Sequence, residues 1–533
     1  MLLAGFCLFL FFYGLNQFGL VGADEPRYAQ VAREMLERHD WITPVLGGQP
    51  WLEKPPLYYW QAMVAYSMFG VKDWVARLPS ALDATLLVLA MYFFLRRFRR
   101  GYELDGALIA ASSAGVVGLG RAAATDMPLA ASFGIALIAW WMWRECGNRF
   151  YLAVFYALLG FGMLAKGPVA PVLAGAVIVL YAMAANDMRF LWRTLWLPGV
   201  ALFLAISAPW YVAVQIRNPT FFRTFILEHN FARFSSNLYH HRQPFWFYGP
   251  VILVALMPWT VFVLAAAART VRLWWNERMW RQGSAAAVPE NALSLFALMW
   301  LLVPVALFSA SHSKLPAYIL PAVPAGALLL VEYIRQNIQE LGNQRPPRFL
   351  VVLHSLVAAA PVFPALLVQY LITQHRIPPG KPLFAAAAIS AVLAIVVVMT
   401  VSGKLGTRAL RFATMIPVVF AVGALLKLGS GTVDESLSAR SVAADIQSHQ
   451  PHPMPLAVQG VRREIDFGLA FYRNQPPLHL DSEVQPQSEY LLIVPHDSSV
   501  SASGRRALLL GSFEAQHLDS YWIFPASQAP PTP

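Results

Sequence analysis

Apolar stretches about 20 residues long recur along the whole chain, and each is long enough to cross a bilayer as an α-helix. A segment inside a bilayer must satisfy its own backbone hydrogen bonds, so helices are the structure that these stretches predict. The sequence therefore predicts an all-α polytopic membrane protein with about thirteen spans. They fall near Leu2–Leu20, Leu78–Leu95, Leu104–Gly120, Met127–Trp143, Tyr151–Leu164, Pro168–Ala185, Leu195–Val214, Phe247–Ala267, Ala292–Phe308, Leu315–Ile334, Leu350–Ile372, Pro382–Val401 and Leu410–Leu426.

Charged residues make up only 13% of the 533 positions, whereas a soluble domain carries about 25%. A deficit sustained over the whole chain indicates that most of the surface faces lipid. The formal net charge of +11 fits basic loops that meet anionic membrane lipids. We therefore expect membrane lipids as partners and no nucleic acid.

Basic residues cluster in alternate loops, which predicts the orientation of the chain. Because cytoplasmic loops are enriched in Lys and Arg, the face that carries these clusters is expected to be cytoplasmic. The N-terminus would then lie inside and the C-terminus outside. The first twenty residues could instead be a cleaved signal peptide, although no basic segment precedes them. The clusters are Arg96–Arg100, Arg144 with Arg149, Arg189 with Arg193, Arg269–Arg281, Arg335–Arg348 and Lys404–Arg411.

Three segments on the predicted outer side are longer than simple connectors: residues 21–77, residues 215–246 and the tail. In the first, Asp24 or Glu25 can cap a helix with Pro26 at its first position. Leu57–Phe69 reads as a second, amphipathic helix that lies in the membrane interface. These patterns predict two helices packed outside the spans.

The tail becomes polar near residue 430, and strands can be read at Tyr490–Val494 and Ala507–Leu510. We therefore divide the chain into a membrane domain, residues 1–429, and a soluble domain, residues 430–533. The soluble domain is expected to be a small α/β unit.

Several cations lie on the outer side, where the bias toward cytoplasmic charge disfavours them. Lys166 and Lys314 fall in very short connectors, and Lys54 lies in the first long loop. Arg233 and Arg242 lie in the second long loop. Cations kept on this side suggest a fixed anion, and a lipid phosphate is the obvious one.

Acidic residues and histidines share this predicted face. Asp24 is also readable as a helix cap, Glu53 as half of a surface ion pair, and Asp126 as a charge at a helix end. His229 and His241 are also readable as interfacial side chains without a metal. Their coincidence on one side of the membrane favours a functional site.

The motifs that hold these residues resemble one family. DEPRYAQVAREM, DWITPVLGGQPWLEKPPLYYW, TDMPL, AKGPV, HHRQPFWFY and SKLPAYILP resemble, in the same order, the bacterial branch of the GT-C glycosyltransferases. That branch is similar to the dolichyl-phosphate-mannose protein mannosyltransferases and includes the aminoarabinose transferase that modifies lipid A. The resemblance runs from about Gly14 to Ala325. It implies a GT-C fold in a bacterial inner membrane, with the active site and C-terminal domain in the periplasm.

The resemblance also implies roles for single residues. Asp24 and Asp126 are the expected catalytic residues. Glu53 matches a carboxylate that binds a divalent metal, Zn²⁺ in the aminoarabinose enzyme, and the second ligand would be His229 or His241, with His240 third. The expected substrate- and phosphate-binding residues are Arg27, Tyr28, Lys54, Tyr59, Lys166, Arg233, Arg242, Lys314 and Tyr318.

The function that follows is transfer of a sugar from a polyprenyl-phosphate-linked donor to an envelope acceptor at the periplasmic face. The acceptor would be lipid A, another glycolipid or polysaccharide, or a protein. The alternative is a lipid or sugar transporter. A transporter would place ionisable residues near mid-membrane, and the predicted spans have mostly apolar centres.

Overall fold

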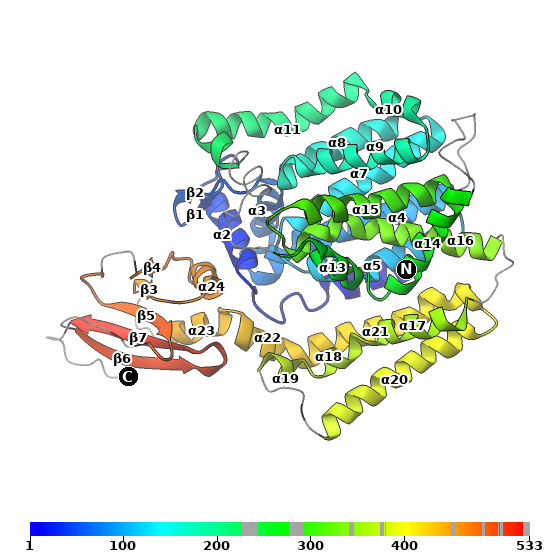
Figure 1. The fold of residues 1–533 in the computed structure, drawn as a ribbon. Helices are drawn as coiled ribbons and strands as arrows, with labels where there is room; N and C mark the ends of the chain where they lie inside the picture. Colours follow the sequence, from blue (N-terminus) through cyan, green and yellow to red (C-terminus); the bar gives the residue numbers. More distant parts are fainter. Residues whose placement is uncertain are drawn as a thin grey trace.

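A computed structural model of the chain describes residues 1–225, 243–276, 291–339, 346–373, 378, 380–448, 454–481, 485–498, 500 and 505–525. It has a large helical part and a smaller unit at the C-terminal end that contains a β-sheet (Figure 1). The all-α membrane fold with a small C-terminal α/β unit, predicted from the sequence, is confirmed.

Long helices lie side by side and form the main bundle (Figure 1). A second layer of helices from later in the chain lies along it. The main bundle contains α4 (Asp73–Phe98), α5 (Glu103–Ser112), α6 (Ala114–Gly120), α7 (Asp126–Cys146), α8 (Arg149–Lys166), α9 (Val169–Ala184), α11 (Leu197–Arg217), α13 (Tyr248–Ala255), α14 (Thr260–Asn276), α15 (Ala292–Ala310) and α16 (Val323–Gln339). The second layer contains α17 (Arg348–Ala359), α18 (Val362–Leu366), α20 (Lys381–Ser402) and α21 (Leu410–Ala424).

Among the described residues, 8 helices are long and apolar enough to cross a membrane, or up to 9 if one bent pair is counted. The bent pair turns by 115° between α13 and α14, within the span predicted at Phe247–Ala267. The span predicted at Leu104–Gly120 is divided between α5 and α6, because Ser113 has an extended backbone. Breaks and short helices thus lower the number of full spans, and the number thirteen stays a prediction.

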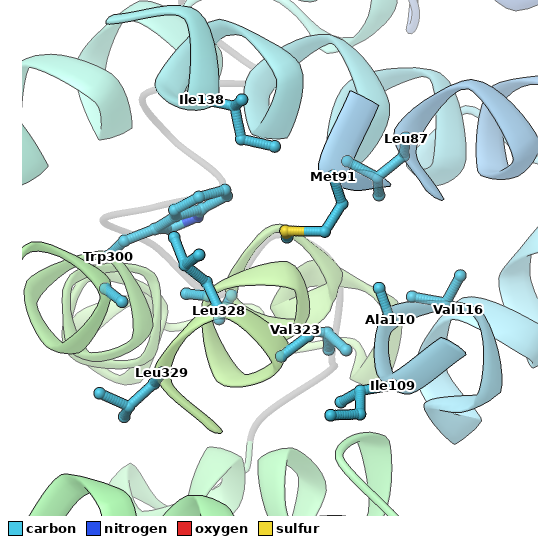
Figure 2. Packing of buried hydrophobic residues seen from close by; sticks show 14 of the residues in the cluster. Leu87, Met91, Ile109, Ala110, Val116, Ile138, Trp300, Val323, Leu328 and Leu329 are labelled. Carbon is cyan, nitrogen blue, oxygen red and sulfur yellow. The ribbon is translucent and has the colours of Figure 1, made fainter. Parts of the chain in front are cut away.

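The core of the main bundle is apolar and joins helices that are far apart in the sequence. Leu87 and Met91 from α4 lie near Ile138 from α7 and Trp300 from α15 (Figure 2). In the helical segment Pro316–Gln339, which ends in α16, 89% of the most apolar 18-residue stretch is buried. In α20 the buried share of the corresponding stretch is only 22%. Because α20 is strongly apolar and exposed, it presents a surface suited to lipid.

Two helices outside the bundle form the first outer segment: α2 (Asp24–Glu37) and α3 (Leu57–Phe69). Both predicted helices are confirmed. The predicted cap is wrong: α2 begins at Asp24, its N-cap is Ala23 without a side-chain hydrogen bond, and Pro26 is its third residue. The carboxylate of Glu25 accepts instead from the amide of Val21, at 2.8 Å.

The described residues of the C-terminal unit form three α-helices and a mixed five-stranded sheet. Its strand order is β4-β3-β5-β7-β6, with β3 parallel to both neighbours and β7 antiparallel to both of its own. The predicted strands lie within β5 and β6. The helices are α22 (Ser430–Leu437), α23 (Arg440–Ser448) and α24 (Arg463–Arg473), and the strands are β3 (Leu456–Val458), β4 (Leu478–His479), β5 (Tyr490–Pro495), β6 (Arg505–Phe513) and β7 (Leu518–Pro525).

The C-terminal unit packs against the first outer segment, where α24 lies on α2 (Figure 1). Arg33 of α2 donates to the carbonyl of Phe471, at 3.0 Å. Asn474 donates to the carboxylate of Glu37, at 3.1 Å. The tail therefore completes the surface on which the expected site residues lie.

Candidate active site

The N-terminal turn of α2 places an acid, a guanidinium and a phenol side by side. Arg27 forms an ion pair with Asp24 and donates to the hydroxyl of Tyr28 at 3.5 Å. Its guanidinium carbon lies 5.1 Å from the ring centroids of both Tyr28 and Trp51. The Arg27 side chain is 12% exposed, whereas that of Asp24 is 53% exposed. Asp24 is therefore the open member of the group, and Arg27 is the enclosed one.

The electrostatics of this group follow from burial and from its neighbours. Burial alone lowers the pKa of Arg27, but Tyr28, Asp24 and Glu53 outweigh it and raise that pKa above its ordinary value. Burial raises the pKa of the Tyr28 and Tyr59 phenols well above their ordinary value. Arg27 is thus a permanent cation, and the two phenols remain neutral hydrogen-bond donors.

A second group joins two helix ends and one loop. Lys166, the last residue of α8, donates to the carboxylate of Asp126, the first residue of α7, at 2.5 Å. The Lys166 ammonium lies 4.5 Å from the ring centroid of Tyr318, in the 3₁₀ segment η4 (Pro316–Ala322). Asp126 also contributes to the raised pKa of Tyr28. The two groups are therefore parts of one site.

The loop before α3 supplies further members. Glu53 is close enough to raise the pKa of both Arg27 and Tyr59, and it is half-buried, as is Lys54. Lys314 is buried and donates to the carbonyl of Ser311. The structure thus brings Glu53 into the site. Lys314 lies on the connector that leads to η4.

The buried Arg27 Nε has no hydrogen-bond partner in the part of the chain that the structure describes. Among the same residues, the buried Trp51 Nε1 and the Tyr59 hydroxyl interact only with each other. A buried polar group without a partner costs about 1–3 kcal/mol. A polar ligand at this place would satisfy the Arg27 Nε, which marks the site as one prepared for a substrate.

Part of the predicted site lies outside the described residues: Arg233, Arg242, His229, His240 and His241. Among the described residues, no group of three His, Cys, Asp or Glu side chains is placed to hold a metal ion. Glu53 is the one predicted metal ligand that the structure describes.

One buried ion pair in this region was not singled out from the sequence. Arg77 of α4 donates to both carboxylate oxygens of Glu25, at 3.1 and 2.7 Å, and to three backbone carbonyls of residues 15–19. Glu25 also accepts from the amide of Ala123, at 2.7 Å. This pair fixes the start of α2, and with it Asp24 and Arg27. Glu25 lies in the DEPRYAQVAREM motif, and Arg77 is the last residue of the first outer segment. No pattern in the sequence indicates that the two residues pair.

The C-terminal unit also reaches the site, which was not predicted. The ring centroid of Phe467 in α24 lies 5.5 Å from the Arg27 guanidinium. Two hydrogen bonds hold the C-terminal unit against the rest of the chain. Arg440 donates to the carboxylate of Asp73 at 3.1 Å, and Asp434 accepts from the amide of Gly19 at 2.7 Å. A side-chain carbon added to Gly19 would lie only 2.4 Å from the Tyr472 hydroxyl, so only glycine permits this approach.

Comparison with known proteins agrees with the resemblance read from the motifs. Residues 53–212 match the family model described as dolichyl-phosphate-mannose-protein mannosyltransferase. The undecaprenyl phosphate-α-4-amino-4-deoxy-L-arabinose arabinosyl transferase of Pseudomonas aeruginosa is 32% identical over 352 residues, which are 64% of this chain and 60% of the relative. The transferase of the same name from Aeromonas salmonicida is 29% identical, over 82% of this chain and 78% of the relative.

Solved structures extend the likeness over the full length. The crystal structure of ArnT from Cupriavidus metallidurans bound to undecaprenyl phosphate superposes with a TM-score of 0.78 and 23% identity, over 100% of this chain and 99% of that one. The apo structure of the same protein gives a TM-score of 0.75 at 22% identity. At these identities the match establishes the fold.

Fold and site together define a multi-pass membrane protein with the GT-C fold. In sequence, residues 53–212 are similar to the dolichyl-phosphate-mannose-protein mannosyltransferases, and a longer part of the chain is similar to the aminoarabinose transferases. The matched region spans about 60% of the length of the Pseudomonas aeruginosa relatives.

Proposed function

We propose that this chain transfers a sugar from a polyprenyl-phosphate-linked donor to an envelope acceptor at the periplasmic face of the inner membrane. The observation that carries the proposal is the cluster of acids and cations at one end of the bundle, together with the unpartnered Nε of Arg27 among the described residues. The curated relatives named above use an undecaprenyl-phosphate-linked sugar, and the similar ArnT structure holds undecaprenyl phosphate. Both agree with a donor that enters from the membrane.

The chemistry follows from the charges. Departure of the sugar leaves negative charge on the phosphate of the polyprenyl carrier, and Lys54, Lys166 and Arg27 are preorganised cations that stabilise it. Asp24, the exposed carboxylate, takes the proton of an acceptor hydroxyl. If the acceptor is itself a phosphate, no base is needed, and Asp24 then orients the sugar. Asp126 holds Lys166 in position through their ion pair.

The test is sugar transfer by the purified full chain in detergent. We expect undecaprenyl-phosphate-linked 4-amino-4-deoxy-L-arabinose, supplied with lipid A, to give modified lipid A that mass spectrometry detects. Detergent removes the compartments that a transporter needs, so product formation separates the enzyme from the alternative transporter. If no panel of undecaprenyl-phosphate sugars and envelope acceptors yields product, the proposal is wrong.

A divalent metal, Zn²⁺ in the aminoarabinose enzyme, is part of the proposal, with Glu53 and either His229 or His241 as its ligands. Carboxylate and imidazole are both ligands that zinc accepts, and such an ion would supply further positive charge toward the donor phosphate. We expect about one equivalent of metal in purified protein, and its loss in Glu53→Ala. Equal metal content in Glu53→Ala and in the native chain would exclude this ligand.

The orientation is also part of the proposal. It rests on the basic loops and places Lys166, Lys314 and the C-terminal unit in the periplasm. In a cysteine-labelling experiment on intact cells, Asp481→Cys is expected to react with an impermeant reagent, whereas Arg97→Cys is not. The reverse pattern would invert the topology.

A further inference from the structure

A cavity of about 490 Å³ lies at the other end of α7 and α8, away from the candidate active site. Its lining residues come from the last turn of α7, the start of α8, and the short helix α10 (Met188–Thr194) with the residues after it. Its size is that of an ordinary small-molecule site. The side chains that matter for its chemistry are Trp143, Arg144, Arg149, Phe190, Arg193 and Trp196.

The cavity is basic. The Arg144 side chain is 5% exposed, and its ion pair with Asp187 is long, at 3.4 Å. The Nε and Nη1 atoms of Arg144 have no hydrogen-bond partner in the described part of the chain. Arg149 and Arg193 are exposed at the rim, and neither makes an ion pair with a described residue. Three guanidinium groups therefore line the cavity, and only that of Arg144 is paired with a carboxylate of a described residue, which leaves a net positive charge.

The walls of the cavity are fixed in place. Trp140 donates to the Thr194 hydroxyl at 3.1 Å, and Tyr156 donates to the Thr194 carbonyl at 2.7 Å. The Arg144 guanidinium carbon lies 5.3 Å from the ring centroid of Phe190. The backbone at Arg193 is thus held to α7 and α8, and a bound anion would meet a preformed pocket rather than flexible side chains alone.

Exposed apolar residues surround the same rim. Trp192 is 71% exposed, Leu195 is 63% exposed and Leu197 is 83% exposed. Exposed apolar side chains do not stabilise a soluble anion. An anionic lipid, in contrast, binds best where a basic site for its headgroup lies beside an apolar surface for its acyl chains. Basic pockets between membrane helices bind anionic lipid headgroups in this way.

We propose that this cavity binds the headgroup phosphate of an anionic glycerophospholipid, whose acyl chains run along Leu195 and Leu197. The site is separate from sugar transfer: it lies at the opposite ends of α7 and α8 from Asp126 and Lys166. It gives the chain one specific lipid contact on that side of the membrane, in addition to the diffuse attraction of its basic loops.

The experiment is native mass spectrometry of the full chain, after incubation with equal amounts of phosphatidylglycerol and phosphatidylcholine that carry the same acyl chains. We expect phosphatidylglycerol to be retained in excess. Since one arginine near a membrane surface contributes about 1 kcal/mol, Arg193→Gln and Arg149→Gln should each lower that excess about fivefold. Both side chains are exposed, and an unchanged melting temperature will confirm that the variants fold.

Arg189→Gln is the matched control, because Arg189 is exposed on the same short helix but does not line the cavity. Its retention of phosphatidylglycerol should equal that of the native chain. Three results would overturn the proposal: equal retention of the two lipids, an equal loss in Arg189→Gln and Arg193→Gln, or displacement of the lipid by glycerol 3-phosphate at matched concentration. The last would show that a soluble phosphate is the occupant.

Discussion

Helix α7 carries ion pairs at both ends, and the pair of Asp126 differs in its surroundings from the pair of Glu145. At the N-terminal end, Asp126 faces Lys166, and the same ammonium lies over the ring of Tyr318. At the C-terminal end, Glu145 accepts from Arg99 at 3.0 Å. Both pairs join helices across the bundle, so the difference lies in what surrounds them.

At the C-terminal end, Glu145 belongs to a closed network, which is distinct from the open cavity beside Arg144. Arg99 also donates to Glu332 at 3.0 Å, and Glu332 pairs with Arg335 at 3.1 Å. Glu332 is fully buried, so its charge must be neutralised by these arginines. Near the other end, Arg27 keeps a buried Nε atom that no described residue pairs with. The same chemistry thus holds helices together around Glu145 and leaves binding capacity unused around Arg27.

The largest expected effect is at the open end. Asp24→Asn removes the carboxylate that would accept a proton, so transfer should fall about 10³-fold. The side chain is half-exposed, so no cavity forms and the melting temperature should not change. Activity near the native level in a sugar-transfer assay would remove Asp24 from the mechanism.

A cation of the open end comes next. Lys54→Ala removes a charge that would stabilise the leaving phosphate, and the rate should fall about 300-fold. Lys72→Ala is the control, because Lys72 is exposed at the start of α4 and has no place in the site. An equal loss of rate in the two variants would show that the total positive charge of the protein, and not the position of Lys54, stabilises the leaving phosphate.

The closed end should respond in stability instead. Arg99→Ala leaves Glu145 without its ion-pair partner and Glu332 with only Arg335, so the free energy of unfolding should fall by about 3 kcal/mol. Thermal unfolding in detergent measures this loss. Sugar transfer per folded molecule should remain at the native rate. An Arg99→Ala variant that is stable but inactive would contradict the assignment of stability to the Arg99 network and of catalysis to the group around Arg27.

The smallest effect tests the contact from the C-terminal unit. Phe467→Ala removes one ring from the Arg27 guanidinium, and KM for the donor should rise about threefold, the size of an exposed cation–π contact. Leu509→Ala, an exposed apolar change on β6, is the control. A change in kcat alone would assign Phe467 a different role.

Local structure could be predicted well from the sequence. Helix α3 begins and ends at the predicted residues, Leu57 and Phe69, and β5 contains the predicted strand. Both are coded by short-range patterns of apolar residues. The helix start at Asp24 was predicted within a few residues, but its cap was not, because the Glu25 carboxylate binds the Val21 amide and Arg77 instead.

Long-range pairing could not be predicted in the same way. Glu25 and Arg77 are 52 residues apart, and the sequence offers many cations that could have met that carboxylate. Asp126 and Lys166 were placed on the same face of the membrane, but their contact depends on how α7 and α8 pack. The break at Ser113 and the bend between α13 and α14 are different, because Ser112 with Ser113 and Pro258 give local signals for them in the sequence.

The approach of the tail to Gly19 has a consequence for how the protein is made. The hydrogen bond from Gly19 to Asp434 joins residues 415 positions apart. The first outer segment is therefore synthesised long before the C-terminal residues that it packs against. Arg33 meets the Phe471 carbonyl in the same way. A chain that stops before α24 contains the long helices described above but lacks this packing on α2. The packing of the first outer segment therefore depends on the last part of the chain to be made.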